Sequence, residues 1–149
     1  MVKIRAARPD DAQVWCGMRH ALWPEGSAEE HAREIEEFFA GRAREPLAVL
    51  VAESISGQLS GFAELSIRPY AEGCETDRVG FLEGWYVIPE ARVQGVGRAL
   101  VEAAEAWARD QGCTEFASDT EADNERSAAA HRALGFTEVA LIRCFRKDL

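Results

Sequence analysis

The residues with the clearest chemical potential lie in the stretch 86–100, whose sequence is YVIPEARVQGVGRAL. Gly95 and Gly97 allow the backbone to approach a ligand closely, and a helix that starts beside them points its first N–H groups at that ligand. Because a helix N-terminus favours an anion, the ligand is expected to be negatively charged. The side chains that add donors suited to a pyrophosphate are Arg92, Gln94 and Arg98.

Two other nucleotide-binding motifs fit this stretch poorly. A P-loop requires Lys followed by Ser or Thr after its last glycine, where this chain has Arg98 and Ala99. A dinucleotide fingerprint requires Gly or Ala at position 100, which is Leu100. A tight strand-to-helix connection without a ligand remains an alternative.

Two carboxylates also stand out by their positions. Glu83 lies inside an otherwise apolar strand pattern, where a carboxylate is costly unless it is paired or faces a cavity. Asp119 follows the next short strand pattern, at the carboxyl end where open α/β sheets place ligands. Both are candidate site residues. The alternatives are a buried salt bridge for Glu83 and a cap or turn role for Asp119.

The elements that must position these residues follow from the spacing of apolar and breaker residues. Trp15, Met18 and Leu22 recur at helical spacing, whereas residues 79–88 are apolar on both faces and indicate a central strand. The expected strands are 2–7, 47–52, 58–68, 79–88, 114–118 and a final strand or pair within 137–147. The expected helices run from about 10 to 23, 27 to 41, 98 to 112 and 124 to 134. This order predicts one mixed α/β domain over residues 1–149, a central mixed β-sheet flanked by about four helices.

Composition excludes several classes of protein. With 149 residues, 47% of them hydrophobic, the chain can bury roughly two thirds of its unfolded surface, which excludes disordered and fibrous proteins. Its 17 Lys+Arg against 26 Asp+Glu give a net charge of −9. This charge argues against binding to nucleic acid or to an anionic membrane and favours a cationic partner.

The cysteines and the apolar runs bear on location. The four cysteines, Cys16, Cys74, Cys113 and Cys144, lie far apart with no metal-binding spacing, as expected of reduced thiols. The first ten residues lack the apolar stretch of roughly 7 residues that a signal peptide needs. No run approaches the roughly 20 apolar residues of a membrane span. We expect a cytoplasmic protein with no bound metal.

The motif Arg92-x-x-Gly95-x-Gly97 after an apolar strand resembles the acyl-CoA signature of the GNAT acetyltransferase superfamily. The segment HRALGF, from His131 to Phe136, matches that superfamily's aromatic-x-x-x-Gly-Phe segment, and the element order agrees throughout. The resemblance implies that acetyl-CoA is bound, with its pantetheine arm on backbone groups of Tyr86, Val87 and Ile88. It places the pyrophosphate on Arg92, Val93, Gln94, Gly95, Val96 and Gly97. Asn124 matches a cofactor-contacting Asn, or it is a helix N-cap.

Three further segments resemble the bacterial aminoglycoside 6′-N-acetyltransferases of the GNAT type. They are Leu22-Trp23, FLEGWYV at 81–87 and EFASDT at 115–120. This resemblance implies transfer of an acetyl group to the 6′-amine of an aminoglycoside antibiotic in a ternary complex, which confers resistance. It assigns Glu83 and Asp119 to the acceptor site and places Trp23 and Tyr70 along the acceptor pocket, although core packing also explains an aromatic residue at either position.

The chemistry gives these residues roles. An ammonium cannot attack a thioester, so carboxylates at Glu83 and Asp119 would orient the amine and accept its proton. Backbone N–H groups near Val87 would polarise the thioester carbonyl. His131 stands where the superfamily often has a tyrosine as general acid, and a histidine can donate a proton near pH 7; a packing role is the alternative.

Other functions remain open at the level of sequence. The same motifs suit a GNAT enzyme that acetylates another polyamine or a protein N-terminus, a non-catalytic acyl-CoA sensor, or a purely structural module. The resembling family often forms dimers, and the final strand could exchange between subunits, so a homodimer is expected.

Overall fold

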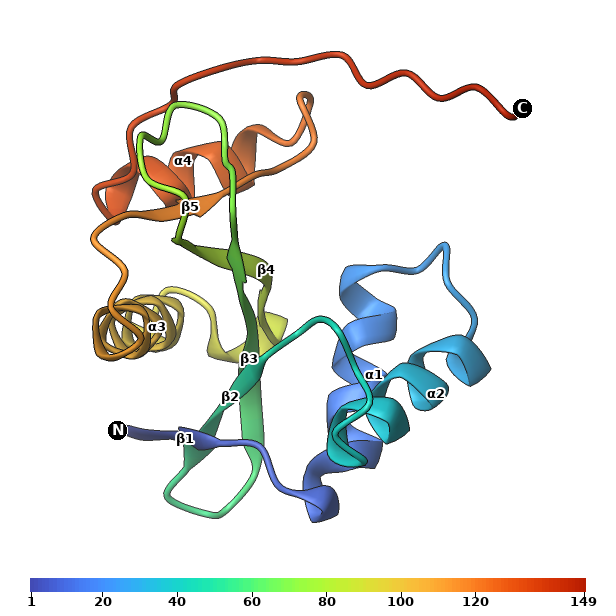
Figure 1. Ribbon diagram of the computed structural model, residues 1–149. Helices are drawn as coiled ribbons and strands as arrows, with labels where there is room; N and C mark the ends of the chain where they lie inside the picture. The colour runs from blue at the N-terminus through green and yellow to red at the C-terminus, as the bar shows by residue number, and fades with distance from the viewer.

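The computed structural model describes all residues, 1–149. A five-stranded sheet forms its centre, with the strands in the order β1-β2-β3-β4-β5 (Figure 1). The first four strands pair antiparallel with their neighbours, and β5 pairs parallel with β4. The expected mixed sheet is confirmed. The strands are β1 (Val2–Ala6), β2 (Ala48–Ser54), β3 (Leu59–Arg68), β4 (Val79–Val87) and β5 (Phe116–Ser118).

Helices cover both faces of this sheet (Figure 1). The first two helices pack against each other on one face, the third lies on the other face, and the fourth lies beside β5. None of them is long and apolar enough to cross a membrane. The helices are α1 (Ala12–Leu22), α2 (Ala28–Phe39), α3 (Val96–Asp110) and α4 (Glu125–Ala133), with short 3₁₀ helices η1 (Pro9–Asp11) and η2 (Pro89–Ala91).

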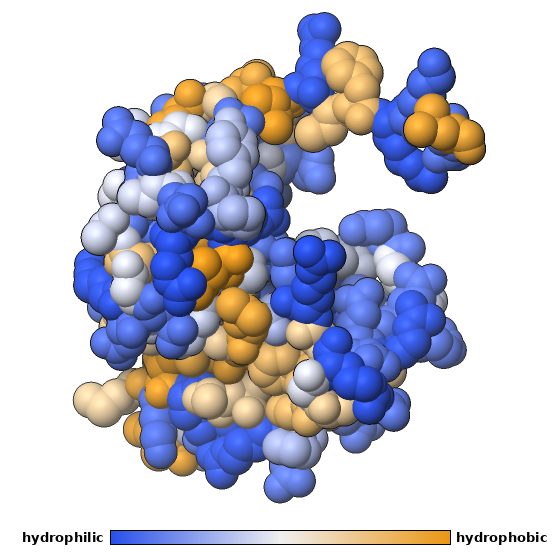
Figure 2. All heavy atoms as spheres, in the orientation of Figure 1, coloured by the Kyte–Doolittle hydropathy of each residue, from blue (hydrophilic) through white to orange (hydrophobic).

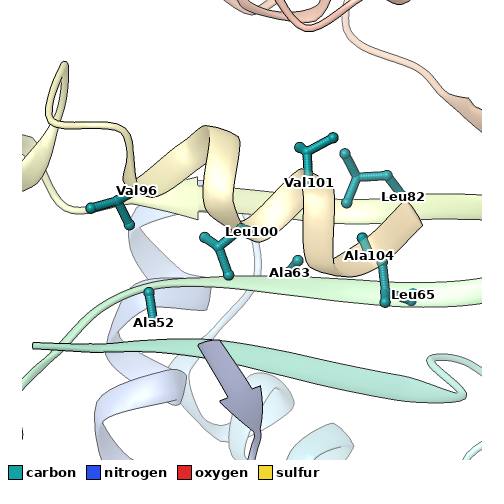
Figure 3. Close-up of a cluster of buried hydrophobic side chains, with 8 residues drawn as sticks. All are labelled: Ala52, Ala63, Leu65, Leu82, Val96, Leu100, Val101 and Ala104. Carbon is teal, nitrogen blue, oxygen red and sulfur yellow. The ribbon is translucent and has the colours of Figure 1, made fainter. Parts of the chain in front are cut away.

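Two apolar clusters hold the sheet from opposite sides. The apolar stripe of α3 contributes Leu100, Val101 and Ala104, each at most 1% exposed, which pack on strand residues such as Ala63 and Leu65 (Figure 3). Each fully buried Leu or Val side chain stabilises the fold by about 1.5–3 kcal/mol. The cluster on the other face consists of Trp15, Met18, Ile35, Val49, Val51 and Phe62. The strands that carry the candidate site are therefore fixed from both faces.

The expected final strand within 137–147 is wrong for this chain, because residues 137–149 form no strand. They run away from the sheet as an extended segment, red in Figure 1. Its large apolar side chains are open to solvent, with Leu141 75% and Phe145 91% exposed. A strand requires a neighbour for its N–H and C=O groups, and this segment pairs with neither outer strand of the sheet, β1 or β5.

Candidate active site

β4 contains one residue more than β3 can pair. In the register of these strands, Glu64 lies opposite Gly84 and Leu65 lies opposite Leu82, which leaves Glu83 without a partner. Such a β-bulge disrupts the ladder, bends the strand and re-aims the side chain that it carries. The carboxylate that the sequence singled out therefore stands at the one irregular point in the pairing of β4.

On its other side, β4 stops pairing with β5 next to the bulge. β4 and β5 are paired only as far as Leu82 and Ser118. Further along, Ile88 donates its N–H to a β3 carbonyl at 2.9 Å, so by alternation the N–H groups of Trp85 and Val87 point away from β3. These two amides face the gap that β5 has left. They can bind an extended chain as an added strand would.

The loop between β4 and α3 presents backbone N–H groups at the N-terminus of a 15-residue helix. Val93 and Gly95 have positive φ angles of 58° and 84°, a conformation that makes a concave cradle of amides. Arg92 ties this loop to the strand, because its Nε donates to the Val87 carbonyl at 2.8 Å. Gln94 likewise donates to the Glu90 carbonyl at 3.0 Å. The candidate anion site therefore offers chiefly backbone N–H groups, since the Arg92 and Gln94 side chains are bound to carbonyls of the chain and support the loop.

His131 lies where β4 and β5 separate. Its Nδ1 is 2.7 Å from the Ser127 carbonyl, and its Nε2 is 2.8 Å from the Ser118 hydroxyl. Because a carbonyl only accepts, Nδ1 carries a proton, and in the neutral ring Nε2 accepts from Ser118. The ring packs edge-on against Trp85 and Phe136, with centroids 5.3 and 5.2 Å away. His131 is therefore both packed and hydrogen-bonded in a single tautomer.

Asn124 caps α4. Its side chain accepts from the backbone N–H of Ser127 at 3.0 Å, as the N-cap alternative predicted. The residue is exposed, and its amide N–H₂ is not used by the cap. A contact between that group and the cofactor stays a prediction.

Arg68, at the end of β3, binds Glu83, one of the two acids of the candidate acceptor site. The Arg68 guanidinium binds both carboxylate oxygens of Glu83, with Nε to Oε2 at 2.9 Å and Nη2 to Oε1 at 2.6 Å. The Ser66 hydroxyl also donates to Oε2. The hydrogen bond to Glu83 is the main cause that raises the pKa of Arg68, and the charge of the exposed Asp119 adds to it. Glu83 therefore forms a salt bridge, which is half-buried and not the buried pair of the alternative, and its role at the acceptor site stays a prediction.

A family model described as the acetyltransferase (GNAT) family matches residues 15–136 of the chain. The chain belongs to the GNAT acetyltransferase family. Among curated relatives, aminoglycoside N(6')-acetyltransferase type 1 of Klebsiella aerogenes is 58% identical over 146 residues, which cover 98% of this chain and 96% of that protein. The relative of the same description from Stenotrophomonas maltophilia is 44% identical, over 98% of this chain and 93% of its own length.

Solved structures of GNAT relatives agree with the fold over its whole length. AAC(6')-Iy in complex with the bisubstrate analogue CoA-S-monomethyl-acetylneamine has a TM-score of 0.91 and 36% identity, covering 100% of this chain and 99% of that one. The apo aminoglycoside 6'-N-acetyltransferase AAC(6')-IG of Acinetobacter haemolyticus has a TM-score of 0.90 and 39% identity, with 99% of each chain covered.

Trp23, which is expected to line the acceptor pocket, lies beside Phe62 on the face of the sheet that α1 and α2 cover. It follows the last residue of α1, and its ring reaches so close to β4 that a Cβ added at Gly84 would be 2.6 Å from Cη2. The ring stacks on His31, with centroids 6.5 Å apart, and the Arg19 guanidinium is 5.0 Å from its centroid. Trp23 is half-buried, so it both packs against β4 and keeps a solvent-facing edge.

Arg19, whose guanidinium lies over the Trp23 ring, forms a buried ion pair with Glu64. Glu64 is 2% exposed and accepts from Arg19 Nε at 2.8 Å and from Trp15 Nε1 at 3.0 Å. Burial raises the pKa of Glu64, while the charge and hydrogen bonds of Arg19 oppose that rise. Arg19 also binds Glu34 at 2.8 Å. This network fixes α1 on β3 and therefore fixes the start of the α1–α2 turn.

The molecular surface is hollowed beside α1 and α2. In Figure 2 a recess opens between the C-terminal segment above and the region of α1 and α2 at the right, with hydrophilic side chains around it. The α1–α2 turn beside it holds a pocket of about 300 Å³. The residues that line this pocket are Arg19, Trp23, Glu25, Gly26, Glu30, His31 and Glu34. Tyr70 is not among them; it lies on the β3–β4 loop and is 64% exposed.

The structure joins Arg92 to Val87 and places Trp23 against Gly84, next to Glu83, but it shows no contact of Tyr70, Asn124 or His131 with another expected site residue. It also adds three residues that were missed. Arg68, Ser118 and the buried Arg19 were not singled out, although each contacts a candidate residue or its support. In the sequence, only their positions could have indicated Arg68 and Ser118, since Arg68 comes just before Pro69 and Ser118 just before Asp119. Both signals are weak, because the partner depends on strand register.

Proposed function

We infer that this GNAT protein is an aminoglycoside 6′-N-acetyltransferase, which uses acetyl-CoA and confers aminoglycoside resistance. The observation that carries this function is the arrangement of polar groups along β4. Within five residues, the strand presents a bulged carboxylate, Glu83, and a backbone amide directed into the β4–β5 gap, that of Val87. Acetyl transfer to an amine requires a carboxylate that orients the amine or accepts its proton, and a hydrogen-bond donor that polarises the thioester carbonyl. The high identity to relatives described as aminoglycoside N(6')-acetyltransferases supports the acceptor.

The cofactor side fits acetyl-CoA. When bound, acetyl-CoA supplies an acetyl group activated as a thioester. The Val87 backbone, with Trp85 beside it, holds the pantetheine arm as an added strand would, and the Val87 N–H donates to the thioester carbonyl oxygen. Ile88 donates its N–H to β3, and by alternation so does Tyr86, so the expected backbone contacts of these two residues with the arm are not available. The amides of 92–97 bind the pyrophosphate at the start of α3, and the Asn124 amide adds a contact.

The acceptor side suits a polycationic sugar. Glu83 orients the 6′-amine, and the exposed Asp119 accepts its proton, directly or through water. The rings of Trp23 and Tyr70 cover sugar faces, where an aromatic surface also attracts ammonium groups. The net charge of −9 draws a polycation toward the site.

His131 supplies the proton that the departing CoA thiolate needs. Its place at the β4–β5 separation puts the ring beside the end of the gap in which the pantetheine arm lies. Its Nδ1 donates to the Ser127 carbonyl, so the proton for the thiolate comes from Nε2 of the doubly protonated ring, which returns to the neutral Nδ1–H form as the thiolate becomes a thiol.

We also propose a cytoplasmic homodimer, in which residues 1–149 of each subunit form one GNAT domain. The extended segment 137–149 supports the dimer, because its apolar side chains, such as Ile142 and Phe145, are exposed and have no partner in their own chain. A second copy provides that partner by strand exchange. The four cysteines are free thiols, as in cytoplasmic proteins.

The test is thiol release from acetyl-CoA with kanamycin, and then with a matched aminoglycoside that carries a 6′-hydroxyl. Turnover with the first compound only is expected. Equal turnover with both would contradict the 6′ position, and acetyl-CoA binding without turnover of either would contradict the acceptor while leaving the cofactor site intact.

A further inference from the structure

Arg68 is bound to one acid of the proposed acceptor site, Glu83. Its guanidinium binds Glu83 through two parallel hydrogen bonds, and the charge of Asp119 acts on it as well. On its other side it lies flat against Phe81, with Cζ 3.6 Å from the ring centroid. A guanidinium between an aromatic ring and a carboxylate is held in one orientation, because both contacts depend on its plane.

The hydrogen bonds leave Glu83 with little free capacity. Each carboxylate oxygen has two lone pairs. On Oε2 both are occupied, by Arg68 Nε and the Ser66 hydroxyl, whereas on Oε1 only one is occupied, by Arg68 Nη2. Glu83 therefore offers one open acceptor position, and its direction is set by Arg68.

We propose that Arg68 is a positioning residue for the acceptor amine, acting through Glu83. It fixes the Glu83 carboxylate so that a single lone pair of Oε1 receives an N–H of the amine, and it leaves Asp119 as the acid that takes the proton. This inference rests on the proposed function, because it requires Glu83 and Asp119 to serve the acceptor.

The charges predict which kinetic constant depends on Arg68. Glu83 and Asp119 with Arg68 carry a summed charge of about −1, and without Arg68 about −2 at neutral pH. Removing the arginine therefore makes the site more attractive to a polycation. Its loss also frees Glu83 to leave its orientation, and a misplacement of about 1 Å can cost about 100-fold in rate. The expected defect lies in kcat and not in acceptor binding.

The first measurement is steady-state kinetics of Arg68→Gln with kanamycin and acetyl-CoA. We expect kcat to fall by about 10- to 100-fold, with the KM for kanamycin unchanged or lower and the KM for acetyl-CoA unchanged. Arg68→Lys should not restore kcat, because an ammonium cannot make two parallel hydrogen bonds.

A double-mutant cycle with Glu83→Gln decides whether Arg68 acts through Glu83. In the Glu83→Gln background, Arg68→Gln should change kcat by less than about 3-fold, because the group that it positions has already been altered. Arg5→Gln is the matched control. Arg5 binds both oxygens of Asp11, at 2.8 and 3.0 Å, on the edge strand β1, so this variant should lower Tm and leave kcat unchanged.

The outcomes separate the inference from the function on which it rests. Wild-type kcat in Arg68→Gln, with a slow Glu83→Gln, overturns the role of Arg68 alone. Equal losses from Arg68→Gln in both backgrounds overturn it too, because the arginine then acts independently of Glu83. Wild-type kcat in Glu83→Gln removes the proposed acceptor acid, and the inference falls with it.

Discussion

Replacing Gly84 with Ala tests whether Trp23 is a wall of the acceptor site that β4 positions. The added Cβ would be 2.6 Å from Cη2 and 2.9 Å from Cζ2 of Trp23. Carbon atoms in contact are about 3.5–4.0 Å apart, so the ring must move by roughly 1 Å. It is not free to do so, because it stacks on His31 and its backbone carbonyl is 3.0 Å from the His31 Nε2.

The magnitude follows from that overlap. Overpacking of this kind costs about 1–3 kcal/mol in the free energy of unfolding, and at about 2–4 °C per kcal/mol Tm should fall by about 2–12 °C. The displaced ring also changes the shape of the proposed acceptor site, and it leaves the proposed acetyl-CoA site unchanged. We therefore expect the KM for kanamycin to rise at least about 5-fold, which is about 1 kcal/mol of binding, while the KM for acetyl-CoA stays within about 2-fold.

Thermal melts and steady-state kinetics measure both effects, with Gly17→Ala as the control. Gly17 is an exposed position in α1 with no atom within 4 Å of an added Cβ. Alanine there should stabilise the helix by about 0.5–1 kcal/mol without changing either KM. If Gly84→Ala has wild-type Tm and a wild-type KM for kanamycin, then Trp23 does not bear on β4 and does not line the acceptor site.

Three further predictions concern pH, the cofactor and assembly. The pKa of Asp11 lies below its usual value of 3.8, chiefly because Arg5 hydrogen-bonds its carboxylate, so the stability that it contributes is present above that pH and is lost as the pH falls through its folded pKa. Asp11→Asn should therefore lower Tm at pH 7 and flatten the fall of Tm below pH 3.8, and a parallel fall in both proteins would contradict this. Asn124→Asp retains an acceptor for the Ser127 N–H but loses the amide donor, so it should keep Tm and weaken acetyl-CoA binding in calorimetry, whereas unchanged binding would leave Asn124 as a cap alone. Removing residues 137–149 should convert a dimer to a monomer in light scattering, and a truncated protein that remains dimeric would exclude strand exchange.

The order of elements could be predicted because each depends on local pattern. The helical stripe through Trp15 and Met18 and the alternation in 58–68 both survive as α1 and β3, with ends displaced by a residue or two. Residues 137–147 carry an equally good strand pattern, yet they form none. A strand needs an edge to pair with, and that requirement is not written in the segment itself.

In the candidate site, too, the locally determined parts could be predicted and the parts that depend on distant partners could not. The loop at 92–97 could be assigned from its glycines and arginine, because an amide cradle at a helix N-terminus is a local structure. The partner of Glu83 could not, since it depends on the register of β3 against β4 and on a bulge that shifts that register. The hydrogen bond between Ser118 and His131 likewise joins a strand end to a helix, and sequence spacing alone does not specify it.

The central claim is that one strand serves both substrates, with Glu83 working on the acceptor and the Val87 edge holding acetyl-CoA. The most direct test is to measure, for Glu83→Gln, kcat/KM for kanamycin and the Kd for acetyl-CoA in the same preparation. The account predicts a loss of about 100-fold or more in kcat/KM, within the range of general acid–base contributions, and an unchanged Kd. A wild-type kcat/KM, or an equal weakening of acetyl-CoA binding, would contradict it.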